Sequence, residues 1–228
     1  MAILNFKPLL YVLNVSDFEN KELFNKAYDV LNSERKEKID RFLFEKDKKL
    51  SLGAGVLLRY ALQKANISDY NIVLGQNGKP YLKNGDIYFN LSHSGEMAVC
   101  VIAPFEVGCD IELAATPNMK IAKRFFTDEE YSDIIASTDS EDRFYRYWTL
   151  KESFIKATGY GMKMPLDAFS INLNGNITVN QNIDSRDYCF REIGGIDNYR
   201  CAVCGLQDLS NMVISVKTPN EIISEMII

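Results

Sequence analysis

Two acidic residues on one predicted strand are the first feature of this sequence that could do chemistry. Asp110 and Glu112 lie two positions apart in the segment 107–112, so both side chains point to the same face of a strand. Two carboxylates on one face repel each other unless they are solvated or share a cation. Mg²⁺ suits such a pair, because it binds a few carboxylate oxygens and leaves room for water and phosphate oxygens. The pair therefore indicates either a magnesium site or a solvated strand edge.

A third carboxylate, Glu152, lies in a helical pattern with Lys151 and Lys156 beside it. Glu152 and Lys156 are four residues apart in the order that favours an ion pair, worth ~0.3–0.5 kcal/mol on a helix surface, and this alone would explain both. The neighbouring residues are instead those of a largely buried helix: Phe144, Tyr147, Trp148, Phe154 and Ile155. A buried carboxylate needs partners. We therefore expect Glu152 to share a magnesium ion with Asp110 and Glu112, at a site that handles phosphates.

The only histidine, His93, lies in a polar segment (89–95) that follows a predicted strand. Successive Asn, Ser, His, Ser and Gly residues offer many hydrogen-bond donors, which suits a phosphate or carbonyl ligand. An ordinary hydrogen-bonded loop histidine explains the residue equally well. Ser92 and His93 are adjacent in sequence, so they cannot readily take up the geometry of a catalytic triad. This argues against a serine hydrolase.

The elements that would position these residues form two successive groups, and the first group ends near residue 105. We expect one or two strands in 3–15, helices over 33–45 and 46–64, strands over 71–74, 87–91 and 97–103, and a turn at 76–80. The first helix would bury Ile39, Phe42 and Leu43. Its outer face is basic, which is consistent with a solvated face or with a local site for an anion.

The second group repeats the order of the first only loosely. A strand over 107–111 precedes a helix that begins at the capping box of Thr127 and Glu130. A long helix should run over 140–158 and end at Gly159. A hairpin over 169–180 carries Asn174-Gly175, the sequence of a type I′ turn. Strands over 188–192, 199–204 and 212–216 would complete a sheet.

Composition excludes several classes of protein. The 228 residues carry a net charge of −5, so no global basic surface for nucleic acid is present. No apolar run reaches the ~20 residues of a membrane span, and the first residues lack the basic region of a secretory signal, so we expect a cytoplasmic protein. We expect the five cysteines to be reduced. The pair Cys201-x-x-Cys204 lies on a predicted strand and cannot by itself fill a four-ligand zinc site.

Together these segments resemble the 4′-phosphopantetheinyl transferases of the surfactin-synthetase-activating (Sfp) type. The resemblance covers nearly the whole chain. It rests on five segments that occur in the family's order and at similar spacings: Gly78-Lys79-Pro80, 89–94, Gly108 to Glu112, Arg124 to Tyr131, and Trp148 to Ser153 with Lys156. Each segment alone is weak evidence, whereas five in order are specific.

The resemblance implies an enzyme that transfers the 4′-phosphopantetheine moiety of coenzyme A to a serine of an apo acyl or peptidyl carrier protein. Adenosine 3′,5′-bisphosphate is released, and Mg²⁺ is required. The implied fold is an α+β pseudodimer of two similar α/β halves with the active site in the cleft between them, so we expect halves at 1–105 and 106–228. The implied partners are coenzyme A and a carrier protein, with no nucleic acid or membrane, and the implied state is a monomer.

The family's site residues match this sequence position by position. Asp110, Glu112 and Glu152 match magnesium ligands, and Lys151 and Lys156 match residues near the coenzyme A phosphates. The remaining matches are Lys79 and Pro80 at the adenine, and Ser92, His93, Arg35, Lys38 and Ser51 at the 3′-phosphate. Arg35 replaces the more common lysine, and Cys109 replaces the usual Ile or Val. Glu130 matches an acidic position near the metal, but its capping box explains it, so it is left out of the ligand set. Trp148 is expected to be a packing anchor.

This comparison gives a mechanism from the residues. Glu152, directly or through a water, would act as the base for the carrier serine, Lys156 would neutralise or protonate the departing phosphate, and Lys151 would act as an electrostatic clamp. Two other hypotheses are a magnesium-dependent phosphohydrolase of coenzyme A or a nucleotide, and a module that binds without catalysis. Which carrier is served is open: the basic residues of 120–124 fit an acidic carrier helix or a solvated edge equally well.

Overall fold

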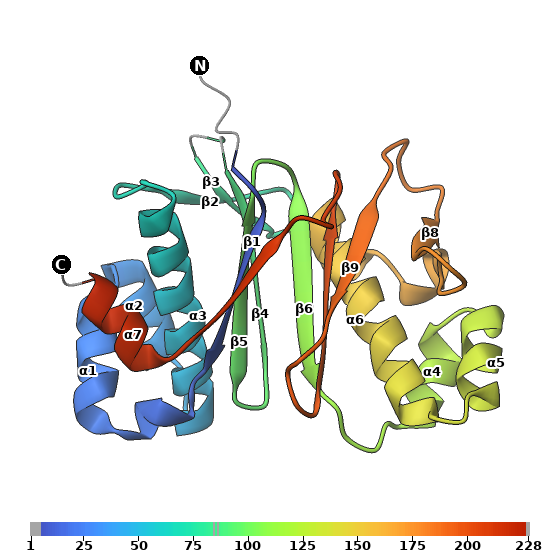
Figure 1. Cartoon of the computed structure of the whole chain (residues 1–228), viewed down its shortest axis with the longest axis horizontal. Coiled ribbons are helices and arrows are strands. Elements are labelled where there is room, and N and C mark those ends of the chain that lie inside the picture. Colours follow the sequence, from blue (N-terminus) through green and yellow to red (C-terminus); the bar gives the residue numbers. More distant parts are fainter. Residues whose placement is uncertain (1–5, 84, 86, 227–228) are drawn as a thin grey trace.

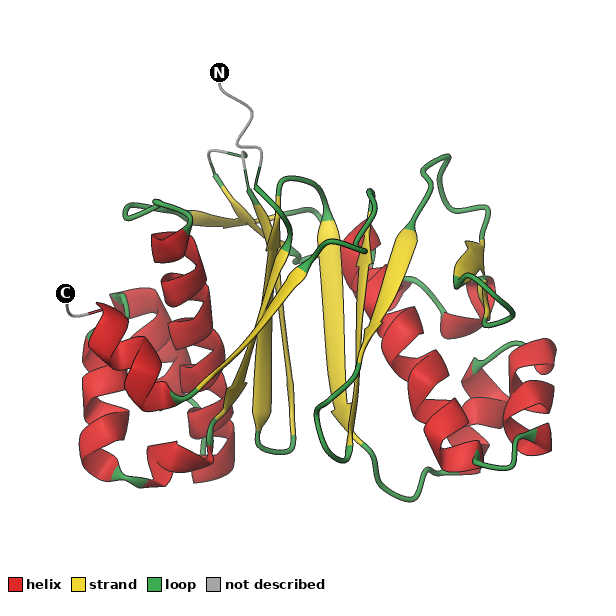
Figure 2. Ribbon diagram, viewed as in Figure 1, coloured by secondary structure: helices red, strands yellow, loops and turns green. Residues whose placement is uncertain are grey.

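A computed structural model describes residues 6–226 except 84 and 86, and it shows two sheets side by side between two groups of helices (Figures 1 and 2). The helices are α1 (Lys21–Asp29), α2 (Ser33–Asp40), α3 (Glu45–Lys64), α4 (Met119–Phe125), α5 (Asp128–Ala136), α6 (Ser140–Thr158) and α7 (Pro219–Met226). The strands are β1 (Leu9–Asn14), β2 (Ile72–Leu74), β3 (Pro80–Leu82), β4 (Tyr88–Ser94), β5 (Met97–Ala103), β6 (Val107–Leu113), β7 (Ser170–Asn172), β8 (Thr178–Asn180), β9 (Cys189–Ile193), β10 (Tyr199–Gly205) and β11 (Val213–Lys217).

The first sheet has the order β11-β1-β5-β4, and helices α1, α2, α3 and α7 lie on its outer side (Figure 1). Strand β1 is antiparallel to β5 and parallel to β11. We predicted that 212–216 would join the strands around 190 and 200, and this is wrong, because β11 pairs with β1 instead. Helix α7 follows it, and Glu225 binds Tyr60 at 2.7 Å and Lys64 at 2.5 Å on α3. The end of the chain therefore completes the first sheet.

The second sheet has the order β6-β10-β9 and is covered by α6. Short hairpins β2-β3 and β7-β8 stand apart from both sheets. The type I′ turn predicted at Asn174-Gly175 is wrong, because only Gly175 of the two has a positive φ (78°). The five-residue loop between β7 and β8 instead contains an Asx turn, in which the Asn174 N–H donates to Asn172 Oδ1 at 2.8 Å.

Most predicted elements occur where the periodicity placed them, with two differences near the N-terminus. The predicted helix over 33–45 ends at Asp40, and the chain leaves it through a tighter turn in which the Phe42 N–H donates to the Ile39 carbonyl at 3.2 Å. Leu43 is consequently 89% exposed and does not join the buried Ile39. The strand expected within 3–15 is β1, and positions 3–5 lie outside the described residues. No helix of the described chain is long and apolar enough to cross a membrane.

Strand β6 and helix α6 approach each other more closely than side chains normally permit. A Cβ atom on Gly108 would lie 2.2 Å from the Ser153 carbonyl oxygen and 2.3 Å from the Ala157 nitrogen. Both are backbone atoms of α6, so no side-chain rotation could relieve the clash. Glycine at 108 therefore sets the distance between β6, which carries Asp110 and Glu112, and α6, which carries Glu152.

We predict that Gly108→Ala separates β6 from α6 and lowers the free energy of unfolding by about 3 kcal/mol, the upper range for an overpacked core. Urea denaturation followed by fluorescence of Trp148, the only tryptophan, measures this. Gly194→Ala is the matched control, since a Cβ there meets nothing within 4 Å. Equal stability of both variants would show that β6 and α6 can separate freely.

Candidate active site

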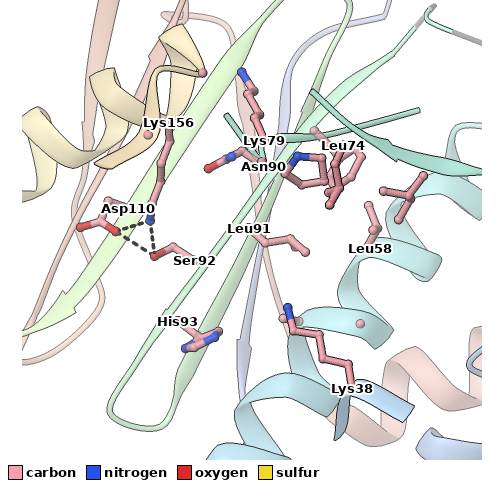
Figure 3. Close-up of a pocket in the computed structure, with 18 of the residues that line it drawn as sticks. Lys38, Leu58, Leu74, Lys79, Asn90, Leu91, Ser92, His93, Asp110 and Lys156 are labelled. Atoms are coloured by element: carbon pink, nitrogen blue, oxygen red, sulfur yellow. Dashed lines mark hydrogen bonds and ion pairs between the residues drawn. The ribbon is translucent and has the colours of Figure 1, made fainter. Parts of the chain in front are cut away.

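A cavity of about 830 Å³ lies between helix α3 of the first half and helix α6 of the second, and β4 forms its floor (Figure 3). One wall comes from α2, α3 and the β2-β3 hairpin, and the other from β6 and α6. The predicted site residues that line it are Arg35, Lys38, Lys79, Pro80, Ser92, His93, Asp110, Glu112, Glu152 and Lys156. The fold thus brings together all the predicted residues except Ser51 and Lys151.

An ion pair between α6 and β6 and a hydroxyl of β4 join one wall to the floor at the acidic end of the cavity. Lys156 Nζ lies 2.6 Å from Asp110 Oδ1 and 3.0 Å from Ser92 Oγ (Figure 3). The Ser92 hydroxyl donates to the same Asp110 oxygen at 2.8 Å. Lys156 therefore binds Asp110 within the wall formed by α6 and β6, and does not form the surface pair with Glu152 that its spacing alone would allow.

Burial and mutual repulsion perturb the acidic residues. Burial raises the pKa of Glu152, Asp110 raises it further, and Lys156 opposes the shift. Burial likewise raises the pKa of Glu112, while Ser94 opposes that shift. Burial alone would lower the pKa of Lys156, but Asp110, Cys109 and Glu152 together outweigh burial and the net shift is upward. Lys156 is thus a permanent cation at neutral pH, beside carboxylates that hold protons more readily than usual.

The three carboxylates repel one another, and a bound cation would relieve this repulsion. Asp110 is 3% exposed, and its Oδ2 atom has no hydrogen-bond partner in the described part of the chain. A buried carboxylate oxygen without a partner is costly, and a divalent cation would satisfy it. Among the described residues, no three His, Cys, Asp or Glu side chains form a complete metal site by themselves. The residues fit a cation that also takes oxygens from a ligand.

The opposite end of the cavity is basic. Lys38 and the exposed His93 face it, and Arg35 lies against α3, where it donates to the Ser51 carbonyl at 2.5 Å. Partial desolvation, then Lys156, Arg35 and Lys38, lower the pKa of His93, so its ring is neutral at pH 7. The Ser51 side chain is buried and does not line the cavity, and its hydroxyl has no hydrogen-bond partner in the described part of the chain.

Lys79 fixes the turn between β2 and β3 against the second half of the molecule. Its side chain is buried, and Nζ donates to the carbonyls of Ala157 at 2.8 Å and Val107 at 3.3 Å. Asn77 donates to the Gly159 carbonyl at 3.1 Å. Burial lowers the pKa of Lys79 to about 8. Both donors bind carbonyls at the C-terminal end of α6, where a helix favours positive groups, so the turn is anchored before any ligand binds.

Lys151 does not reach the cavity, which corrects our expectation of a clamp on the phosphates. It is completely buried and donates to Glu130 Oε1 and to the Phe169 carbonyl, each at 2.7 Å. Glu130 forms the predicted capping box with Thr127 and also accepts from the Ile171 N–H at 2.8 Å. The capping box therefore accounts for only some of the contacts of Glu130, which also forms a buried ion pair with Lys151. This pair ties α6 to α5 and β7.

Sequence reasoning missed several cavity residues. Trp148, expected only to pack, lines the cavity and stacks on Phe144 with ring centroids 5.7 Å apart. Its position one turn before Glu152 was the available signal, since residues four apart share a helix face. Asn90 lies two positions before Ser92 on the same strand face. The side chains of Leu58, Leu74 and Leu91 form an apolar part of the lining (Figure 3) that no local pattern marked. Tyr70 also lines the cavity.

Comparison with known proteins identifies the family. Residues 106–204 match the model of the 4′-phosphopantetheinyl transferase superfamily, and 19–104 match that of its N-terminal domain. A 4′-phosphopantetheinyl transferase of Bacillus subtilis is 36% identical over 202 residues, covering 85% of this chain and 90% of that protein. The chain belongs to the 4′-phosphopantetheinyl transferase family. The resemblance, the two-half α/β fold and the prediction of a transferase are thereby confirmed.

Two further proteins are compared with this chain. The transferase Sfp of Bacillus subtilis strain 168 is 36% identical over 182 residues, covering 76% of this chain and 81% of that protein. The holo-[acyl-carrier-protein] synthase of Thermotoga maritima has 19% identity and a TM-score of 0.40, and the match covers 46% of this chain and 64% of that one.

We predict that Lys151→Met lowers the free energy of unfolding by about 3–5 kcal/mol, because it leaves Glu130 buried without its counter-charge. The double variant Glu130→Leu/Lys151→Met should recover part of this loss, since both charges are then removed. Chemical denaturation measures both, with the exposed Lys123→Met as control. A Lys151→Met protein of wild-type stability that has lost only turnover would restore the clamp hypothesis.

Proposed function

We propose that this transferase moves the 4′-phosphopantetheine arm of coenzyme A to a serine of an apo acyl or peptidyl carrier protein and releases adenosine 3′,5′-bisphosphate. The observation that carries the proposal is the distribution of charge in the cavity. Asp110 and Lys156 lie on one side of the cavity and Lys38 lies on the other (Figure 3), while His93 stands on β4, which forms the floor. Coenzyme A carries a pyrophosphate and a separate 3′-phosphate, so its two anionic groups suit these two sides.

Asp110, Glu112 and Glu152 would hold Mg²⁺, consistent with the unpartnered Oδ2 atom of Asp110. When bound, the ion supplies positive charge to the pyrophosphate oxygens. Lys38, His93 and Arg35 would hold the 3′-phosphate. We assign Ser92 to the acidic end of the cavity instead of the 3′-phosphate, because its hydroxyl is hydrogen-bonded to Asp110 and Lys156. Lys79 and Pro80 would form the wall beside the adenine.

The transfer needs a base for the carrier serine and a counter-charge for the leaving group. The serine oxygen forms a bond to the phosphorus of the arm, the bridging phosphorus–oxygen bond breaks, and its electron pair leaves with the bisphosphate. We assign the serine proton to Glu152, whose raised pKa makes it a better base near neutral pH. Lys156, held at the acidic end by Asp110, neutralises the charge that develops on the leaving phosphate.

Both Bacillus subtilis relatives compared above are named as transferases, and no observation favours hydrolysis of coenzyme A, so the phosphohydrolase is not proposed. A carrier protein remains the proposed acceptor. Cytoplasmic location and a monomeric state stay predictions.

We predict that Glu152→Gln reduces transfer by at least about 10²-fold, the smaller effect of losing a general base, while affinity for coenzyme A without metal changes little. Mass spectrometry of an apo carrier protein, incubated with coenzyme A and Mg²⁺, detects the added arm. Glu129→Gln, an exposed residue, is the control. Turnover like that of the wild type would exclude Glu152 as base and as essential ligand.

We also predict that coenzyme A binds more tightly as the pH falls from 8 to 6. His93 is neutral in the free protein because its pKa is lowered, and a bound phosphate dianion favours the imidazolium, so binding takes up a proton. The effect cannot exceed about tenfold per pH unit, the limit for one proton. Calorimetric titration measures it, and His93→Gln should remove most of the slope. An unchanged slope in His93→Gln would place the 3′-phosphate elsewhere.

A further inference from the structure

The two sheets meet along β4 and β6. At this junction, backbone N–H groups of β6 bond to side chains of β4. The strands end their respective sheets and lie side by side (Figures 1 and 3). Three backbone N–H groups of β6 donate to side-chain oxygens of β4: Cys109 to Asn90 at 3.0 Å, Ile111 to Ser92 at 3.4 Å, and Leu113 to Ser94 at 3.2 Å. The partners keep a constant offset, so the two strands run in the same direction.

These bonds supply hydrogen-bond acceptors to the free edge of β6, which pairs with β10 along its other edge. The N–H groups on the free edge would otherwise be buried without acceptors, and an unpaired edge is also prone to pair with another chain. Asn90, Ser92 and Ser94 stand on one face of β4 at every second position and supply the acceptors. The sheets are thereby joined in one register without forming a continuous sheet.

The two serines make a second contact that the junction itself does not require. A hydroxyl can accept and donate at once. Ser92 donates to Asp110 Oδ1 at 2.8 Å, and Ser94 donates to Glu112 Oε2 at 2.7 Å. Each carboxylate of β6 therefore has its own hydroxyl on the opposite sheet, and each hydroxyl is itself held by a backbone N–H.

Ser94 is not part of the cavity wall, so it acts on Glu112 from behind. Glu112 is half-buried and has three side-chain torsions, which would let its carboxylate take many orientations. The bond from Ser94 engages Oε2, and hydrogen bonding from Trp148 also lowers the pKa of Glu112, so the carboxylate is held from β4 and from α6. We propose that Ser94 is a positioning residue, which orients the Glu112 carboxylate toward the cation site of the cavity. The inference rests on the proposed function, because it assumes that Glu112 binds the ion.

The test is the affinity for Mn²⁺, measured from the electron paramagnetic resonance of free Mn²⁺ titrated into coenzyme A-saturated protein. Ser94→Ala should weaken Mn²⁺ binding by about tenfold, the smaller loss typical of a partner behind a metal ligand. Ser94→Thr keeps the hydroxyl and should retain most of the affinity. The KM for Mg²⁺ should rise in Ser94→Ala, while kcat at saturating Mg²⁺ and binding of coenzyme A without metal should change little.

Ser210→Ala is the matched control, because Ser210 also donates to a carboxylate, that of Asp208, but on the exposed surface. A purely structural role would lower the melting temperature of Ser94→Ala and leave Mn²⁺ affinity unchanged. Wild-type Mn²⁺ affinity in Ser94→Ala, with normal transfer by the wild type, would overturn this inference alone. A wild-type protein that neither binds Mn²⁺ nor transfers the arm would overturn the proposed function and the inference with it.

Discussion

Strand β6 is held on three sides, and the geometry of the cavity depends on this. Its backbone pairs with β10, its Gly108 lies against the backbone of α6, and its free N–H groups are taken by side chains of β4. Each contact alone would allow the strand to slide or tilt. Together they leave one position for Asp110 and Glu112, at the junction of both sheets and α6. The acidic end of the cavity is therefore a consequence of packing that reaches far beyond the acidic residues.

The same junction concentrates charge at a cost to folding. Three carboxylates face one cavity, and burial and repulsion raise the pKa of Glu112 and Glu152. Lys156 offsets part of this cost through its ion pair with Asp110. Another ion pair of α6, between Lys151 and Glu130, is completely buried outside the cavity. One helix thus carries two lysines with separate tasks: Lys156 balances the charge of the site, and Lys151 anchors the helix that presents it.

Local signals predicted the parts of the fold that depend on local chemistry. Helix α6 begins after Asp139, whose side chain accepts from the N–H of Asp142, and ends at Gly159 with φ of 76°, so both ends could be predicted from sequence. The partner of β11 could not, because pairing with β1 joins residues about two hundred positions apart. Lys151 illustrates a different limit. It neighbours Glu152 in sequence, but adjacent residues of a helix point about 100° apart, so one side chain enters the core while the other faces the cavity.

The cavity walls are cross-linked before a ligand arrives. Lys79 ties the β2-β3 turn to α6 and β6, and Asn77 binds Gly159 at the end of the same helix. At the other end, Ser92 of the first sheet holds Asp110 of the second. Since both ends are tied, binding of a long ligand along the cavity need not order the two halves relative to each other. A ligand that meets a preformed site loses less affinity to ordering of the protein, so more of its binding energy is retained in the complex.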